Sequence, residues 1–243
     1  MTTASSVILA NQTVCELGEG PVWDAARQQL LWLDIRRGIV FVGRMDRFGR
    51  VELVNHVTFP GTVGAVAVAE DGRWIVAGAQ HVYTHPDNNA LGGIRVIADG
   101  QPRRTNDGKA DPAGRFVVGT LSLEGTSSEE VLVRLDDDGV AVLDDDLTLS
   151  NGFAWSADGA TMYSIDTLRR RIYARPYEVE SGAVGTRQVF IEVTDGYPDG
   201  MCLDAEEHLW IAMWGLGEVH RYTPTGELDR IIPVRAPHVS SVA

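Results

Sequence analysis

Five positions in this sequence recur at a nearly fixed interval and carry side chains that could do chemistry together. Each one immediately precedes a glycine, and these glycines are residues 20, 64, 108, 152 and 200, a spacing of 44, 44, 44 and 48. The preceding residues are Glu19, Val63, Asp107, Asn151 and Asp199. Four of the five bear polar oxygens, and three are carboxylates. Residues in the same phase of a structural repeat occupy equivalent positions, so we expect these side chains to converge on one volume.

Convergent carboxylates favour a bound cation. Acidic groups directed at one small volume repel one another unless a cation or a shared proton compensates. Carboxylate and amide oxygens suit Ca²⁺, Mg²⁺ or Mn²⁺, and Zn²⁺ can also use them. The alternative is that these are ordinary turn residues, because Asn and Asp commonly occur in turns beside glycine. The recurrence in four of five repeats favours a site for a divalent cation.

Each repeat contains the pattern of four short strands separated by turns. In the second repeat, for example, residues 64–69 form an apolar run, and Asp71-Gly72 then gives a strong hairpin signal. No long segment shows an apolar period of 3.6 residues, which predicts an essentially all-β chain. Four strands every ~45 residues are typical of β-propeller blades. The strand that follows each leading glycine is rich in small residues, so we expect it to be the innermost strand of its blade.

The number of repeats sets the expected domain organisation. Five full repeats begin near residues 20, 64, 108, 152 and 200, and a partial sixth begins at residue 238. Residues 6–14 could supply an outer strand that closes the ring. We therefore expect one domain over residues 1–243, a six-bladed β-propeller whose sixth blade is incomplete at the C-terminus. Because such a blade would leave open sheet edges, which soluble proteins normally avoid, this pattern predicts a truncated chain.

Composition excludes several classes of partner. The formal net charge of −13 argues against nucleic acid or an anionic membrane surface, both of which favour basic patches. The first residues lack the pattern of a signal peptide, and no apolar run approaches the roughly 18 residues of a membrane helix. Cys15 and Cys202 have no metal-site spacing and indicate reduced thiols. These features favour a cytoplasmic protein that is a monomer or a weak homo-oligomer.

An acidic run offers a second possible cation site. Residues 136–139 read Asp-Asp-Asp-Gly and resemble part of a calcium loop. The rest of an EF-hand pattern and its flanking helices are missing, so a solvated hairpin tip is the better interpretation.

Four segments together resemble a known family. They are Leu-Gly-Glu-Gly-Pro-Val-Trp at 17–23, Asn-Asp-Gly-Lys-Ala-Asp-Pro-Ala-Gly-Arg at 106–115, Ser-Asn-Gly at 150–152 and Pro-Asp-Gly-Met-Cys-Leu-Asp at 198–204. In combination they resemble the gluconolactonase, senescence marker protein (regucalcin) and luciferin-regenerating enzyme family, from about Cys15 to the C-terminus. The resemblance implies a six-bladed propeller with one catalytic divalent cation at the mouth of its channel.

The resemblance also implies roles for individual residues. Glu19, Asn151 and Asp199 match the metal ligands of the family. Arg104, Asn106 and Glu124 match its contacts to the sugar lactone, and Asp107 would then support the ligands without binding the ion directly. The segment after Glu124, residues 125–130, departs from the Gly-Ala-Leu-Tyr that usually follows in the family.

The reaction implied is metal-assisted hydrolysis of a small sugar lactone. The cation would polarise the ring carbonyl, and Asp199 is the candidate general base that activates water. Arg104 and Asn106 would orient sugar hydroxyls, although Arg104 could instead be a surface charge. The same site could serve a metal-dependent esterase or organophosphatase. A third reading is a non-enzymatic calcium-binding propeller, because the fold alone does not decide function.

Overall fold

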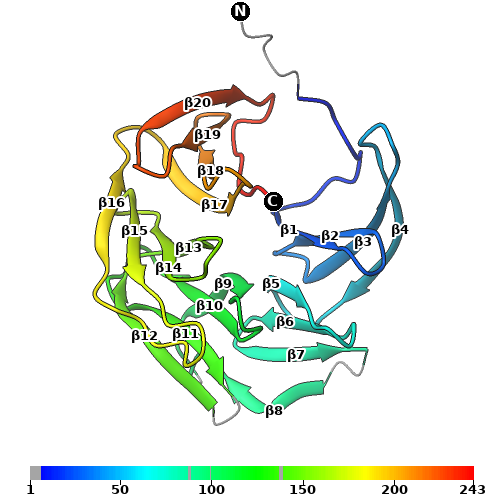
Figure 1. Ribbon diagram of the computed structural model, residues 1–243. Helices are drawn as coiled ribbons and strands as arrows, with labels where there is room; N and C mark the ends of the chain where they lie inside the picture. The colour runs from blue at the N-terminus through cyan, green and yellow to red at the C-terminus, as the bar shows by residue number, and fades with distance from the viewer. Residues whose placement is uncertain (1–6, 87–88, 99, 137–138) are drawn as a thin grey trace, which may run out of the picture.

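A computed structural model describes residues 7–86, 89–98, 100–136 and 139–243 of the chain. All twenty regular elements within these ranges are β-strands, so the expectation of an all-β chain is confirmed. The strands form five four-stranded sheets, and within each sheet consecutive strands pair antiparallel. The five sheets are arranged like blades around a common centre (Figure 1).

The first two sheets contain the N-terminal strands. The first sheet consists of β1 (Gly18–Asp24), β2 (Gln29–Asp34), β3 (Ile39–Met45) and β4 (Val51–Thr58). The second consists of β5 (Val63–Val68), β6 (Trp74–Gly78), β7 (His81–His85) and β8 (Asn89–Arg95).

The remaining three sheets repeat the same order. The third sheet consists of β9 (Arg103–Ala110), β10 (Phe116–Ser122), β11 (Glu130–Asp136) and β12 (Gly139–Leu147). The fourth consists of β13 (Ser150–Trp155), β14 (Thr161–Asp166), β15 (Arg171–Pro176) and β16 (Gln188–Glu192). The fifth consists of β17 (Tyr197–Leu203), β18 (Leu209–Trp214), β19 (Glu218–Tyr222) and β20 (Leu228–Pro233). The first strand of each sheet lies innermost, as the small residues predicted (Figure 1).

The prediction of a six-bladed propeller is wrong: the described residues form five blades. The segment expected to supply an outer strand of a sixth blade bonds instead to the first blade, where Val51 N donates to Ala10 O at 2.8 Å. Residues 238–243 form no strand and make one isolated bridge, between His238 and Trp214. They lie between β17 and β1, because Gly200 N donates to Ser240 O at 2.8 Å and Ser240 Oγ donates to Gly18 O at 2.7 Å.

The hydrophobic core is divided into layers between neighbouring blades. One layer joins Leu33 of the first blade to Val76 of the second, and another joins Val82 to Phe116 of the third. The next two layers join the third blade to the fourth and the fourth to the fifth. No corresponding cluster joins the fifth blade to the first among the described residues. Consistent with this, β1 is only half-buried over most of its length, whereas β5 and β13 are almost wholly buried.

The leading glycines coincide with irregularities in the innermost strands. In all five blades the pairing of the first and second strands shifts register next to the leading glycine, between Asn151 and Phe153 in the fourth blade for example. A β-bulge bends its strand and redirects the nearby side chains. The repeated bulge therefore explains why the residue before each glycine can face a different way from the strand that follows.

Two of these glycines allow adjacent inner strands to approach closely. A Cβ atom added at Gly64 would lie 2.1 Å from the carbonyl oxygen of Asn106, and one at Gly152 would lie 2.6 Å from that of Asp199. Gly152 also has a φ of 37°, a backbone region that disfavours side chains. The small residues of the repeat thus set the distance between the strands that carry the candidate site.

Candidate functional site

A cavity of about 260 Å³ lies where the innermost strands begin. Its polar lining includes Glu19, Asn151 and Asp199, from the first, fourth and fifth blades, together with Arg104 and Asn106 from the third. The rest of the wall is mainly apolar, and its members are Leu17, Ile35, Leu121, Leu149, Thr167, Leu168, Tyr197 and Trp214. The structure therefore brings together five of the residues that the sequence selected, although they are distant in the chain.

The two carboxylates of the cavity are desolvated and repel each other. Burial raises the pKa of Glu19 well above its usual value, and the charges of Asp199 and Asp107 raise it further. Burial likewise raises the pKa of Asp199, with a second contribution from Asp107. Neither carboxylate has an ion-pair partner within 4.0 Å in the described part of the chain. Two ionised groups in this position are costly without a compensating cation.

The amide of Asn151 is held in one orientation by a hydroxyl group. Asn151 Nδ2 donates to Thr167 Oγ1 at 3.1 Å, and this hydroxyl donates to Pro198 O at 2.8 Å. All three residues are buried. The amide nitrogen is thus directed at the protein, and a hydrogen bond from Asn151 also lowers the pKa of Asp199.

Arg104 and Asn106 form a connected pair on β9. Arg104 Nη1 donates to Thr105 O at 2.8 Å and to Asn106 Oδ1 at 3.0 Å. Asn106 Nδ2 donates in turn to Ser150 O at 3.0 Å, which ties the third blade to the residue before Asn151. Burial lowers the pKa of Arg104 to about 10, so the side chain remains charged at neutral pH. The pair presents a positive charge to the same cavity as the two carboxylates.

Asp107 lies behind the cavity and does not line it. Its carboxylate accepts a hydrogen bond from Gly108 N at 2.8 Å. The residue lines a second cavity, formed farther along the inner strands with residues 20–23, 65–68 and 108–110 among others. Burial raises the pKa of Asp107 to about 6. Its charge raises the pKa of both Glu19 and Asp199. Its supporting role stays a prediction.

Glu124 lies away from this group. Its side chain is exposed and lines a separate surface hollow of about 450 Å³ formed with residues 101–103 and 126–129. The loop after β10 thus directs this carboxylate away from the cavity in the structure. Its role in binding substrate stays a prediction, and it would need a rearrangement of the loop.

Three of the lining residues that the predicted site lacked have a recognisable place in the repeat. They are Thr167, Tyr197 and Ile35. Two of them follow a fully buried aspartate that ends the second strand of a blade, Asp34 before Ile35 and Asp166 before Thr167. Tyr197 begins β17 two residues before Asp199. The repeated Asp at the end of the second strand was the sequence signal that could have located Ile35 and Thr167.

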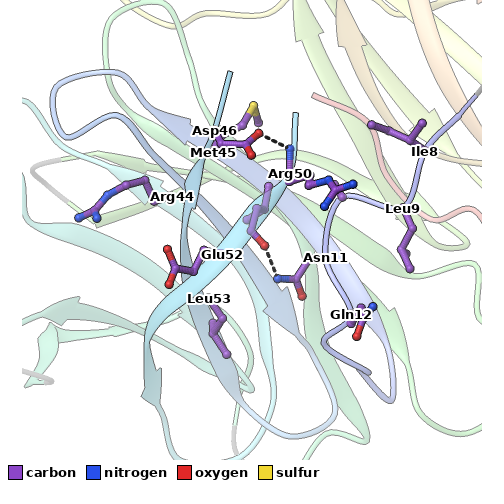
Figure 2. A pocket seen from close by; sticks show the side chains of 12 residues that line it. Ile8, Leu9, Asn11, Gln12, Arg44, Met45, Asp46, Arg50, Glu52 and Leu53 are labelled. Carbon is purple, nitrogen blue, oxygen red and sulfur yellow. Dashed lines mark hydrogen bonds between the residues drawn. The ribbon is translucent and has the colours of Figure 1, made fainter. Parts of the chain in front are cut away.

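A larger hollow lies elsewhere and has different chemistry. It measures about 780 Å³ and lies between residues 8–12 and the outer strands of the first blade (Figure 2). There Asn11 Nδ2 donates to Val51 O at 2.6 Å, and Arg50 N donates to Asp46 Oδ1 at 2.9 Å. Its charged side chains do not converge on one point, and no inner strand contributes to it. The smaller cavity on the axis is therefore the better candidate site.

Another acidic cluster is neutralised by an arginine side chain. Ligand atoms of Asp204, Glu206 and His208 lie within 4.8 Å of one another. The Arg221 guanidinium is 2.7 Å from Asp204 and 2.5 Å from Glu206, and it also pairs with Asp229 at 2.8 Å. The arginine compensates the negative charge, so the cluster has no need of a metal ion.

The donor set of the axial cavity fits a hard divalent cation. It offers two desolvated carboxylates with no ion-pair partner among the described residues and one amide whose nitrogen is bonded elsewhere. Oxygen donors of this kind are preferred by Ca²⁺, Mg²⁺ and Mn²⁺. The residues that would hold the ion are Glu19, Asn151 and Asp199.

Comparison with known proteins identifies the family. The family model described as "SMP-30/Gluconolactonase/LRE-like region" matches residues 17–243. The chain belongs to this family. It is 34% identical to pentonolactonase XacC of Haloferax volcanii over 240 residues, covering 95% of this chain and 78% of the relative. It is also 34% identical to human regucalcin over 236 residues, covering 92% of this chain and 76% of the relative.

A solved structure of a family member supports the fold. The calcium-binding protein regucalcin from Agrobacterium tumefaciens superposes with a TM-score of 0.87 at 26% identity, over 96% of this chain and 79% of that one. The resemblance inferred from the four sequence segments is thereby confirmed. Within the described ranges, no helix is long and apolar enough to cross a membrane.

Proposed function

We propose that this protein is a divalent-metal-dependent hydrolase that opens sugar lactones, with aldonolactones as the first substrates to test. The observation that carries the proposal is the convergence of Glu19, Asn151 and Asp199 on one cavity beside Arg104. The homology to a pentonolactonase gives independent support. The cavity volume of about 260 Å³ is below the roughly 300–1,000 Å³ of pockets for drug-sized ligands, which suits a single sugar ring.

The side chains divide the work of hydrolysis between them. A divalent cation bound by the three oxygen donors would polarise the lactone carbonyl. Asp199, on the edge of this donor set, accepts the proton of the attacking water as general base. Arg104 and Asn106 orient the hydroxyl groups of the sugar, and the apolar wall with Tyr197 and Trp214 packs against its carbon face. Water adds to the carbonyl carbon, the ring ester bond breaks, and the proton taken up by Asp199 passes to the departing ring oxygen. The product is one hydroxy acid, whose carboxyl group ionises and releases a proton at neutral pH.

A pH-indicator assay tests this proposal. Purified protein is offered pentono- and hexonolactones, and the acid released is compared with the spontaneous rate. We expect hydrolysis that is lost with a chelator and restored by Ca²⁺, Mn²⁺ or Zn²⁺. The variant Asp199→Ala should lose the metal-dependent rate, whereas Glu206→Gln, which alters the cluster around Arg221, should keep it. Tight metal binding without hydrolysis of any lactone would contradict the proposal and favour a non-enzymatic calcium-binding protein.

A further inference from the structure

Three pairs of adjacent arginines lie near the cavity. They are Arg36-Arg37, Arg103-Arg104 and Arg169-Arg170. The last pair is followed by a third arginine, Arg171, which forms an ion pair with Glu192 at 2.9 Å. The first pair follows β2, the second begins β9, and the third follows β14. Each pair belongs to a different blade, and together they contain six of the 21 Lys and Arg residues in a chain with a net charge of −13.

One arginine of each pair is neutralised by a fully buried carboxylate. The three ion pairs are Arg37–Asp34 at 3.9 Å, Arg103–Glu130 at 3.2 Å and Arg169–Asp166 at 3.0 Å. In every case the acidic side chain has no exposed surface. These arginines balance internal charges and anchor the turns that carry the pairs.

The other arginine of each pair has no ion-pair partner in the described part of the chain. We call Arg36, Arg104 and Arg170 the arginine collar. Arg36 is exposed, and Arg104 donates to the neutral oxygens of its own strand. Arg170 donates to Thr194 O at 3.0 Å, and its guanidinium lies 4.8 Å from the ring centroid of Tyr197. The hydrogen-bond partners and the ring contact of Arg104 and Arg170 are neutral groups.

The arginine collar lies at or next to the lining of the candidate active site. Arg104 lines the cavity directly, and Tyr197, which Arg170 covers, is part of the same wall. Arg36 directly follows the lining residue Ile35. The positive charge of Arg36 also contributes to lowering the pKa of Arg104, which places the two charges within interaction range. Three blades thus contribute positive charge at or beside the lining of this cavity.

A cation at the proposed metal site would leave this charge unbalanced. Glu19 and Asp199 attract Arg104 when they are the only other charges in the cavity. A bound divalent ion would neutralise the negative charge of these two carboxylates, so that they would no longer balance the charge of Arg104. Positive charge around the mouth of a cleft raises the local concentration of anionic ligands. Guanidinium groups also bind carboxylates and phosphates through paired hydrogen bonds.

We propose that the arginine collar selects lactones that carry a further anionic group, a carboxylate or a phosphate monoester, on the carbon chain outside the ring. This inference rests on the proposed lactonase function and specifies its substrate class. The lactone ring occupies the cavity, and the anionic group reaches outward to Arg36 and Arg170.

Matched substrates test the selection. The carboxylate arm compares D-glucaro-1,4-lactone with neutral D-glucono-1,4-lactone, and the phosphate arm compares 6-phosphoglucono-1,5-lactone with glucono-1,5-lactone. We expect kcat/KM to be about tenfold higher for at least one anionic substrate than for its neutral partner, from about threefold per exposed charge. Added salt should reduce this ratio because it screens exposed charges. The arm that shows the preference identifies the anionic group.

Variants distinguish the effect of the collar arginines on substrate preference from the effect of the net charge of the protein. Arg36→Gln should lower the anionic-to-neutral ratio about threefold, and Arg36→Gln combined with Arg170→Gln should nearly abolish it. The control Arg44→Gln makes the same charge change at an exposed position in the first blade and should leave the ratio unaltered. Equal kcat/KM values in both arms, or a ratio that the double variant keeps, would overturn the inference.

A binding measurement separates this inference from the proposed function. Calorimetric titration with glucarate and gluconate compares a dianion with a monoanion of the same chain length. Tighter binding of glucarate that depends on Arg36 and Arg170 would support the collar even if no lactone were hydrolysed. Equal binding of the two acids without hydrolysis would refute both proposals, whereas hydrolysis of neutral lactones without anionic preference would refute only the collar.

Discussion

The side-chain amide of Asn151 donates a hydrogen bond to Thr167 Oγ1 at 3.1 Å, and through this hydroxyl it is connected to the backbone just before Asp199. Two candidate metal ligands from different blades are therefore positioned by one threonine. Partners of this kind orient metal ligands, and their loss commonly costs 10–100-fold in metal affinity or activity.

We expect Thr167→Val to weaken binding of Ca²⁺ or Mn²⁺ about tenfold, because the amide of Asn151 loses the acceptor that fixes its orientation. Thr167→Ser keeps the hydroxyl and should retain most of the affinity. Isothermal titration measures both. Equal affinities for the valine and serine variants, with wild-type thermal stability, would show that the hydroxyl has no positioning role.

We expect Gly152→Ala to destabilise the protein by about 3 kcal/mol. The added Cβ would be 2.6 Å from Asp199 O, and the φ of 37° adds backbone strain. Gly114 is the matched control, because its φ is 88° but no atom lies within 4 Å of an added Cβ. Gly114→Ala should therefore cost only about 1 kcal/mol. Urea unfolding provides the comparison, and equal losses would show that the close contact between β13 and β17 is unimportant.

The stability of the metal-free protein should depend on the ionisation of Asp107. Its folded-state pKa is raised from 3.8 to about 6, so the protonated side chain favours the folded state. Below pH 4 the unfolded chain is protonated as well, and no penalty arises. As the pH rises through about 6, the folded protein must accommodate the buried charge at a cost of about 3 kcal/mol.

Asp107→Asn removes this penalty and tests it. In the presence of a chelator, the variant should gain stability over the wild type between pH 4 and pH 8, as measured by urea unfolding. Asp158→Asn is a control of opposite sign, since hydrogen bonds from Ser156 and Ala160 lower the pKa of exposed Asp158. A constant difference between Asp107→Asn and the wild type across this range would contradict the effect of burial on Asp107.

The sequence period predicted the inner strands and the residues that they bring together. The leading glycines lie at the register shift of every blade. Residues with the same position in the sequence repeat therefore occupy equivalent positions around the axis. Glu19, Asn151 and Asp199 line one cavity for this reason. Asp107 has the same phase but does not line this cavity. The hydrogen bond from the following glycine does not explain the difference, because Glu19 accepts the equivalent bond from Gly20 N at 3.0 Å.

Features that depend on loops and terminal segments were not predictable from the period. The expected sixth blade failed because residues 10–11 hydrogen-bond to Val51 of β4 instead of forming a new sheet. Glu124 lies on an irregular loop whose direction no repeat specifies. The three arginine pairs are visible in the sequence, but only the structure shows which member of each pair is bound to a buried carboxylate.

The central claim is that Glu19, Asn151 and Asp199 hold one divalent cation on the axis of the propeller. Titration calorimetry of the chelator-treated protein with Ca²⁺ and Mn²⁺ measures this most directly, with Glu19→Gln, Asp199→Asn and the control Glu206→Gln in parallel. We predict one ion bound per chain in the wild type and in Glu206→Gln, and at least a hundredfold weaker binding in Glu19→Gln and Asp199→Asn. Binding that survives both axial substitutions but is lost in Glu206→Gln would place the ion at the cluster around Arg221 and contradict the account.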